Sequence, residues 1–349
     1  MIGPRSMEAA LLAELKKPLV ISEIGLPSQL DVGQVLVKVH YSGICGSQLG
    51  EIDGAKGEDK YLPHLLGHEG SGTVLETGPG VRHIQAGDKV VLHWRKGLGI
   101  ESRTPCYTWN GNQVNAGWVT TFNEFAIVSE NRLTVIPPDS DMRIAALFGC
   151  AVTTGFGVVL NNARIRVGDS VVVFGAGGIG LSIVQAASLA GAHPIIAVDL
   201  HDNRLALASV LGATHSINSA KENVEAAIRK VAPELDSFID NTGVPSVIEL
   251  GYRITKAQGR VTLVGVPRKG SDISLYSLPL HFGKTLSGSH GGEAVPQEDI
   301  PRYMRLFRAG RLSLGQLVTA DYPLDAINRA IEDMRSGRSA GRCLIRLAA

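Results

Sequence analysis

Cysteine, net charge and long hydrophobic runs are all scarce in this sequence. Its four cysteines in 349 residues are too few to form a disulfide framework for a chain of this length. We find no export signal and no apolar run long enough to cross a bilayer, which predicts a cytoplasmic protein with reduced cysteines. The thiols are therefore available for metal binding.

The positive and negative charges almost cancel. The chain has 34 Lys and Arg residues against 33 Asp and Glu, for a net charge of +1. This balance gives no general attraction to nucleic acid or to an anionic membrane, so neither is predicted as a partner. A hydrophobic content of 44% with 19% charged residues is typical of a folded protein, and the length fits about two domains.

A glycine-rich stretch follows the apolar residues 171–174. It has the pattern G-x-G-x-x-G, and the next apolar run ends in Asp199, 19 positions after Gly180. A tight strand-to-helix turn points backbone N–H groups and the helix dipole at a pyrophosphate, and an acidic residue about 20 positions later binds the adenosine ribose. A surface loop with an unrelated Asp is the alternative, and this context disfavours it. The predicted NAD-binding residues here are Gly175, Gly177, Gly178, Ile179, Gly180 and Asp199.

The periodicity of the chain changes twice. From about Met7 to Ser129, short strand-like runs such as residues 35–39 and 89–92 are separated by Gly, Pro and Asp, which predicts a β-rich domain. Residues 1–6 are expected to be either a flexible extension before the first strand or an artefact of the assigned start site. From about residue 152 to 290 strands alternate with helices, and afterwards the pattern of the first domain returns. We therefore expect an α/β fold with a β-rich domain (1–151 and 291–349) and an inserted doubly wound parallel sheet (152–290).

The inserted segment contains six expected strands, the number that a dinucleotide-binding sheet needs. They cover residues 171–174, 194–198, 215–217, 237–240, 260–264 and 285–286. The expected helices cover residues 202–211, with Asp202 as the cap, 221–231 and 245–254. After the insertion, residues 298–308 and 324–334 are expected to be helices and 343–345 a strand.

Three residues outside the glycine-rich stretch have the right types to bind one metal ion. Cys45, His68 and Cys150 would form a Cys/His/Cys set with an open fourth position, as in a catalytic zinc site. Their spacings of 23 and 82 residues are too wide for a zinc finger. On spacing alone, two buried core cysteines and an unrelated surface histidine are the more common arrangement.

The residues around Cys45, His68 and Cys150 favour a metal site over unrelated side chains. The runs Gly43-Ile44-Cys45-Gly46-Ser47, Gly67-His68-Glu69-Gly70 and Gly149-Cys150, then Thr153-Thr154-Gly155-Phe156-Gly157 and the glycine-rich stretch, occur in this order. In this combination the chain resembles the zinc-dependent medium-chain alcohol dehydrogenases from about Met7 to Leu347. The resemblance implies a GroES-like catalytic domain, a Rossmann domain, and hydride transfer between an alcohol carbon and a nicotinamide.

The resemblance also implies roles for single residues. Cys45, His68 and Cys150 would be the zinc ligands, Glu69 would lie behind the metal, and Ser47 would accept the alcohol proton. The further cofactor-binding positions are Thr154 near the nicotinamide, Arg204 near the adenosine ribose, Arg342 near the pyrophosphate, and Val264. A homodimer through the edge of the cofactor-binding sheet is expected, with a tetramer as the alternative.

The sequence departs from the family at three places. Residues 93–118, where relatives hold a structural zinc with four cysteines, contain only Cys106, so one zinc per chain is expected. Gln48 stands where relatives often have an Asp that orients the ligand histidine, which predicts a looser and more electrophilic zinc. Gly50 stands where some relatives end the proton relay in a histidine.

The loop of residues 93–96 predicts an unusual substrate. Trp94 and Arg95 in this loop, with Arg103 and Trp109 expected behind it, suit a polyol, sugar or cyclitol, with or without a phosphate, better than a simple alcohol. A solvated loop with its charges in water is the alternative. Two other functions remain open at this stage: a zinc-free NADPH-dependent quinone or enone reductase, and a non-catalytic protein of the same fold.

Overall fold

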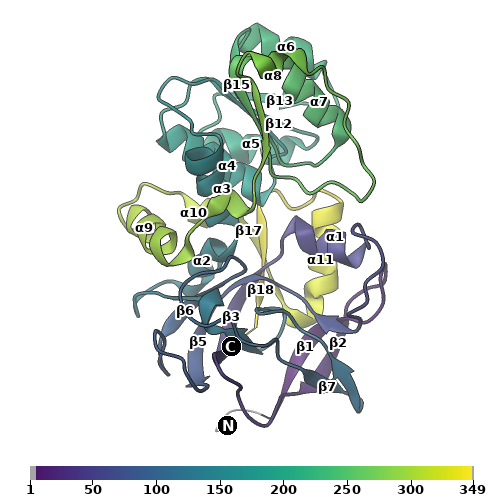
Figure 1. Ribbon diagram of the computed structural model, residues 1–349, viewed down its shortest axis with the longest axis vertical. Coiled ribbons are helices and arrows are strands. Elements are labelled where there is room, and N and C mark those ends of the chain that lie inside the picture. The colour runs from purple at the N-terminus through teal and green to yellow at the C-terminus, as the bar shows by residue number, and fades with distance from the viewer. Residues whose placement is uncertain (1–4, 348–349) are drawn as a thin grey trace. The chain divides into compact units, whose positions relative to one another are not determined.

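The computed structural model describes residues 5–347, which form two compact units (Figure 1). Unit 1 contains the chain up to Cys150 and again from Val295, and unit 2 is Ala151–Ala294. The first strand begins at Ser6. The expected N-terminal extension therefore lies mostly outside the described residues.

Two sheets make up most of unit 1. The strands of the five-stranded sheet are β1 (Ser6–Leu12), β2 (Val20–Gly25), β4 (His64–Leu65), β7 (Tyr107–Trp109) and β8 (Asn112–Val114), in the order β4-β1-β2-β7-β8. The seven-stranded sheet contains β3 (Gln34–Gly43), β5 (Glu69–Thr77), β6 (Lys89–His93), β9 (Phe125–Ser129), β10 (Leu133–Val135), β17 (Val318–Pro323) and β18 (Arg342–Arg346). Its order is β10-β6-β5-β3-β18-β17, and β9 also pairs with β3. The expected β-rich character is confirmed.

The helices of unit 1 are short, and they come from both segments of the chain. They are α1 (Gly46–Ile52), α2 (Met142–Ala145), α9 (Pro296–Arg308), α10 (Leu314–Leu317) and α11 (Ile327–Arg335), with 3-10 turns at Glu130–Arg132, Ala146–Gly149 and Leu324–Ala326. The helix expected at 298–308 starts two residues earlier because Pro296 fits the first turn, where its missing N–H has no partner to lose. The helix expected at 324–334 is interrupted, since its first three residues form a 3-10 turn.

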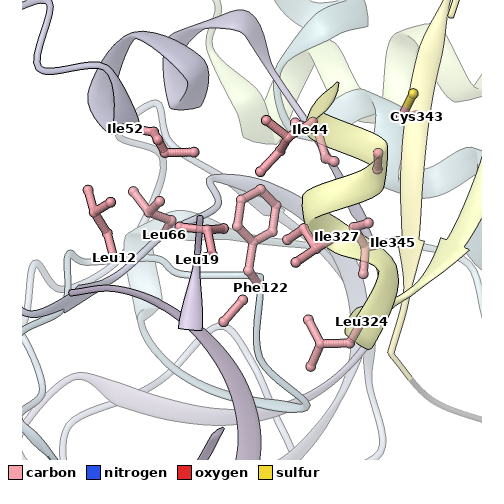
Figure 2. Close-up of a cluster of buried hydrophobic side chains, with 13 residues drawn as sticks. Leu12, Leu19, Ile44, Ile52, Leu66, Phe122, Leu324, Ile327, Cys343 and Ile345 are labelled. Carbon is pink, nitrogen blue, oxygen red and sulfur yellow. The ribbon is translucent and has the colours of Figure 1, made fainter. Parts of the chain in front are cut away.

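One buried cluster joins the two chain segments of unit 1 (Figure 2). Ile44 and Leu66, which lie beside Cys45 and His68, pack in it with Phe122 and with Ile327 from α11. Cys343 and Ile345 of β18 belong to the same cluster. The hydrophobic core therefore holds the segments that carry Cys45 and His68 against the strand that begins with Arg342.

Unit 2 contains one parallel sheet of six strands. These are β11 (Val171–Phe174), β12 (Ile195–Asp199), β13 (His215–Asn218), β14 (Leu235–Asp240), β15 (Thr255–Leu263) and β16 (Thr285–Gly288), in the order β13-β12-β11-β14-β15-β16. Four or more buried apolar residues in a run, as in β11 and β12, are typical of strands covered on both faces. The order is that of the doubly wound dinucleotide-binding fold, as expected.

The helices of unit 2 alternate with its strands. They are α3 (Ala151–Gly157) with a π-helical turn at Val158–Asn162, α4 (Gly178–Leu189), α5 (Asp202–Val210), α6 (Val224–Val231), α7 (Pro245–Ile254) and α8 (Leu278–His281), and a 3-10 turn at Gly291–Glu293. Side chains of α6 and α7 pack on Val172, Ile196 and Phe238, on one face of the sheet. On the other face α4 packs against β11 and α5 against β12.

Two expected helix starts in unit 2 are wrong. Asp202 does not cap α5, because it is already the first helical residue and its carboxylate binds Asn218 and Lys221. The helix expected from residue 221 starts at Val224. The side chain of Asn223 accepts a hydrogen bond from Ala226 N and caps this helix.

No single helix in the described chain is long and apolar enough to cross a membrane. One bent pair of helices, residues 142–149 and 151–162, reaches the required length and composition only when the two are taken together.

Candidate metal centre and cofactor site

Cys45, His68 and Cys150 come together in unit 1. Cys45 precedes α1, His68 precedes β5, and Cys150 follows the 3-10 turn Ala146–Gly149. Their possible ligand atoms all lie within 4.8 Å of one another, and both cysteines are buried. The Nε2 atom of His68 is also buried and has no hydrogen-bond partner among the described residues. Two sulfurs and one imidazole nitrogen at this separation fit a zinc ion with one open position.

The protonation of the three side chains is coupled. A hydrogen bond with Cys150 lowers the pKa of the Cys45 thiol well below its usual value and raises that of Cys150 well above it. Burial lowers the pKa of His68, but the neighbouring Cys45 thiolate outweighs burial and raises it overall. A thiol and an imidazolium must both lose their protons before they bind a metal ion, so metal binding at this site releases protons.

A fully buried ion pair lies beside these sulfurs. Glu69 and Arg342 are 0% and 3% exposed, and Arg342 Nη2 is 2.8 Å from Glu69 Oε1. Arg342 Nη1 also donates to Ile44 O at 2.9 Å. A Cβ on Gly43 would lie 2.2 Å from Glu69 Oε1, so only glycine leaves room for this carboxylate. The positive charge of Arg342 contributes to the lowered pKa of Cys45.

Strand pairing explains why the ion pair forms. Leu344 in β18 pairs with Gly43 in β3, and Ser42 in β3 pairs with Gly70 in β5. These pairings place the first residues of β18 and β5 at the same end of the sheet as Cys45. Arg342, which the sequence assigned to the pyrophosphate, therefore has Glu69 and the Ile44 carbonyl as its direct partners.

Gln48 connects two of the candidate ligands. Its Oε1 accepts a hydrogen bond from Cys45 N at 2.9 Å, and its Nε2 contacts His68 Nδ1. When His68 binds a metal through Nε2, the ring proton must be on Nδ1, which then needs an acceptor. The single amide oxygen of Gln48 would then be shared between two donors. Ser47, one residue earlier, has a buried hydroxyl without a partner in the described structure.

The loop after β6 carries Trp94 against the metal centre. The rings of Trp94 and His68 meet edge to face, with centroids 6.4 Å apart, and the Arg95 guanidinium lies 5.7 Å from the Trp94 ring. His93 is buried, with Nδ1 2.8 Å from Arg95 O and Nε2 2.9 Å from Thr134 Oγ1. Because a carbonyl only accepts, Nδ1 of His93 donates and Nε2 accepts from the threonine. Burial lowers the pKa of His93 to about 4, so this neutral tautomer persists at physiological pH.

The sequence predicted that Arg103 and Trp109 lie behind this loop. The structure does not place them there. Trp109 ends β7 in the other sheet, where it packs against a separate core cluster and donates to Ser22 Oγ at 3.0 Å. Arg103 is exposed, and its carbonyl accepts a bond from Gln34. Strand pairing decides which sheet a residue belongs to, and the distance between residues along the chain does not reveal this.

The glycine-rich turn in unit 2 has the geometry that a dinucleotide needs. Gly175 has a φ of +93°, and a Cβ on Gly180 would lie 1.9 Å from Gly175 O. A Cβ on Gly177 would meet nothing within 4 Å, and this residue is the N-cap of α4. There is therefore open space beside the N-cap of α4, and the N-terminus of a helix is a favourable place for an anion. Gly178 and Ile179 form the first helical turn.

Asp199, the last residue of β12, accepts a hydrogen bond from this turn. Its Oδ2 accepts from Ala176 N at 2.8 Å and its Oδ1 from His201 N at 3.0 Å. Arg204 Nη1 is 3.7 Å from the same carboxylate. Asp199 and Arg204 thus lie next to each other at the glycine-rich turn.

The remaining predicted cofactor positions also lie in unit 2. Thr154 is in α3, with a buried hydroxyl that has no partner in the described structure. Val264 N donates to Asp240 O at 2.8 Å, beside the end of β14. Asn241, which follows β14 at this same strand end, is not among the residues predicted from the sequence. A polar residue directly after a buried parallel strand is the signal that could have found it.

Known proteins resemble the chain over nearly its whole length. Residues 31–138 match the alcohol dehydrogenase GroES-like domain and residues 178–309 the zinc-binding dehydrogenase family. S-(hydroxymethyl)glutathione dehydrogenase from Synechocystis sp. is 32% identical, with 95% of this chain and 97% of that protein covered. Among solved structures, benzyl alcohol dehydrogenase from Acinetobacter calcoaceticus is 30% identical and covers 99% of this chain and 100% of its own, with a TM-score of 0.89. An alcohol dehydrogenase zinc-binding domain protein from Burkholderia ambifaria, at 32% identity, gives the same coverage and TM-score.

Proposed function

The chain belongs to the zinc-dependent medium-chain alcohol dehydrogenases, and from this we propose that it interconverts a hydroxyl-rich or anionic alcohol and its carbonyl compound with NAD. The observation that carries the proposal is the Cys45, His68 and Cys150 cluster with its unpartnered imidazole nitrogen. This cluster disfavours the alternative of a zinc-free quinone reductase, because such an enzyme does not need three metal ligands. Asp199 speaks against NADPH, because a carboxylate repels a 2′-phosphate.

The residues of the metal centre would divide the reaction between metal binding and proton transfer. Bound zinc polarises the oxygen of an alcohol or carbonyl, and bound NAD exchanges a hydride with its carbon. Cys45, His68 and Cys150 hold the metal and leave one position for the substrate oxygen. Ser47 would accept the alcohol proton and pass it on, and Gly50, in place of a relay histidine, supplies no side chain to carry the proton further. Glu69 stays behind the metal, neutralised by Arg342.

The cofactor assignments rest on the geometry of unit 2. The glycine-rich turn and the N-terminus of α4 bind the pyrophosphate, and Asp199 with Arg204 binds the adenosine ribose. Thr154 and Val264 lie along the nicotinamide half. Arg342 remains the proposed pyrophosphate contact from unit 1.

Trp94 and Arg95 support a polyol, sugar or cyclitol substrate, with or without a phosphate. A flat indole beside His68 suits the C–H face of a ring, and Arg95 beyond it suits an anionic or hydroxyl-rich end. The names of the relatives favour S-(hydroxymethyl)glutathione as a second candidate. Its carboxylates could use the same arginine.

A substrate screen with a matched pair of variants tests this proposal. Zinc-loaded protein is assayed with NAD⁺ against simple primary alcohols, sugar alcohols, cyclitols, their phosphates and S-(hydroxymethyl)glutathione. We expect Arg95→Gln to raise the KM of the anionic substrates about tenfold, the value of one charge-assisted hydrogen bond. The exposed Arg103→Gln should change nothing. Faster turnover of simple primary alcohols than of every other class would refute the substrate assignment, and absence of any turnover would refute the reaction.

The edge of the unit 2 sheet supports a homodimer. β16 pairs only with β15 in the described structure, and Tyr276 and Phe282 beside it are 71% and 63% exposed. An open strand edge next to exposed apolar side chains is a common pairing surface. Light scattering of Phe282→Ser should show more monomer than wild type. The need for reduced Cys45 and Cys150 supports a cytoplasmic location.

A further inference from the structure

Asn241 lies at the point where the sheet of unit 2 reverses its order. It directly follows β14, which lies next to β11 in the sheet. From β11 the chain continues outward to β12 and β13, and from β14 it continues the other way to β15 and β16. Ligands of doubly wound sheets bind beyond the carboxyl ends of the strands at this switch point.

The backbone around Asn241 is held firmly. Asp240 is fully buried, and its carboxylate accepts bonds from Thr242 N, Thr242 Oγ1 and Gly243 N at 2.9, 2.6 and 2.9 Å. Asn241 N donates to Phe174 O at 2.8 Å. The backbone from which the Asn241 side chain projects is therefore fixed.

Asn241 itself is half-buried, but both polar atoms of its side chain are buried beside the glycine-rich turn. Neither Oδ1 nor Nδ2 of Asn241 has a hydrogen-bond partner within the described residues. Nδ2 is 3.5 Å from the position that a Cβ on Gly180 would take, and the Asn241 Cβ is 3.3 Å from the corresponding position on Gly175. A buried amide that makes none of its hydrogen bonds is costly, which indicates that a ligand supplies them.

We propose that the Asn241 amide binds a hydroxyl of the nicotinamide ribose. The adenosine ribose already has Asp199, on the other side of β11. An amide both donates and accepts, and so does a ribose hydroxyl, so the two satisfy each other. A phosphate oxygen can only accept, and it would leave Oδ1 of Asn241 unpaired.

Nucleotide fragments and a control variant test this role without any substrate. Asn241→Leu removes the amide at similar volume, and Asn241→Ala replaces it if the leucine variant does not fold. Ser237→Ala is the control, because Ser237 lies on the same strand, far from its carboxyl end, and its buried hydroxyl also lacks a partner. The dissociation constants of NADH, ADP-ribose and AMP are measured on zinc-loaded protein by fluorescence and calorimetry.

We expect the Asn241 variant to bind NADH and ADP-ribose about tenfold more weakly, the value of one to two hydrogen bonds. AMP, which lacks the second ribose, should bind as before, and the control should bind all three normally. Without nucleotide, both variants should melt at or above the wild-type temperature because an unpaired polar group is gone. A lower melting temperature with equal losses for all three ligands would assign Asn241 a structural role.

Unchanged NADH affinity in the variant would also overturn the proposal. The inference depends on NAD binding but not on the identity of the alcohol. If wild-type protein fails to bind NADH, the dinucleotide assignment fails. If wild type binds and the variant matches it, only the role of Asn241 fails.

Discussion

Replacing Arg342 by methionine should destabilise unit 1 far more than the loss of an ordinary ion pair. Glu69 is 0% exposed and Arg342 3% exposed, with 2.8 Å between Oε1 and Nη2. Without Arg342, the Glu69 carboxylate remains fully buried and loses the guanidinium that faces it. Breaking such a pair on one side costs about 3–5 kcal/mol of unfolding free energy.

Removing both charges should restore most of this loss. In the double variant Glu69→Gln/Arg342→Met no uncompensated charge remains, and pairs of neutral residues at buried sites are often as stable as the ions. The coupling energy of the double-mutant cycle should therefore be about 2 kcal/mol or more. Arg143→Met is the control, since Arg143 pairs with Asp321 at 2.9 Å where the two side chains are 32% and 41% exposed. It should cost no more than about 1 kcal/mol.

Tryptophan fluorescence during urea unfolding measures these differences. The three tryptophans, Trp94, Trp109 and Trp118, all lie in unit 1, so the signal follows that unit even if unit 2 unfolds separately. Metal-free protein under reducing conditions separates the ion pair from the contribution of zinc. If Arg342→Met costs no more than Arg143→Met, or if the double variant is no more stable than Arg342→Met, the reasoning is wrong.

Four further predictions concern the same unit. Metal analysis of the purified protein should give one zinc per chain, because Cys106 is the only thiol in residues 93–118; a value near two would contradict this. Gln48→Glu keeps the side-chain length and places a carboxylate at His68 Nδ1, so zinc affinity measured by chelator competition should rise about tenfold; an unchanged affinity and pH profile would rule out the proposed effect of Gln48. His93→Phe should raise KM several-fold more than it lowers kcat. The variant loses the hydrogen bond from His93 Nδ1 to Arg95 O that holds the loop carrying Trp94 and Arg95. Because the pKa of His93 is lowered to about 4, the folded state binds fewer protons than the unfolded state. The wild-type protein should therefore lose unfolding free energy as the pH falls from about 6.5 to about 4. An equal loss in the His93→Phe variant would contradict this prediction.

Local signals explain which parts of the fold were predictable. The central strands β11 and β12 of unit 2 contain uninterrupted runs of four buried apolar residues, and α7 begins at Pro245 as expected because proline fits a first helical turn. The start of α6 was wrong because Asn223, and not the polar run before it, supplies the cap. Competition between several possible caps is decided by packing, which periodicity does not contain.

The sequence by itself determined the glycine-rich turn with Asp199 and the residue types of a zinc site. Both depend on short segments whose backbone conformation and chemistry are local. Only the tertiary structure decided that Cys45, His68 and Cys150 meet, that Arg342 pairs with Glu69, and that Trp109 belongs to another sheet. These contacts join segments up to 298 residues apart, as in the bond from Arg342 to Ile44. Strand register and core packing create them, and neither is written in the spacing of residues along the chain.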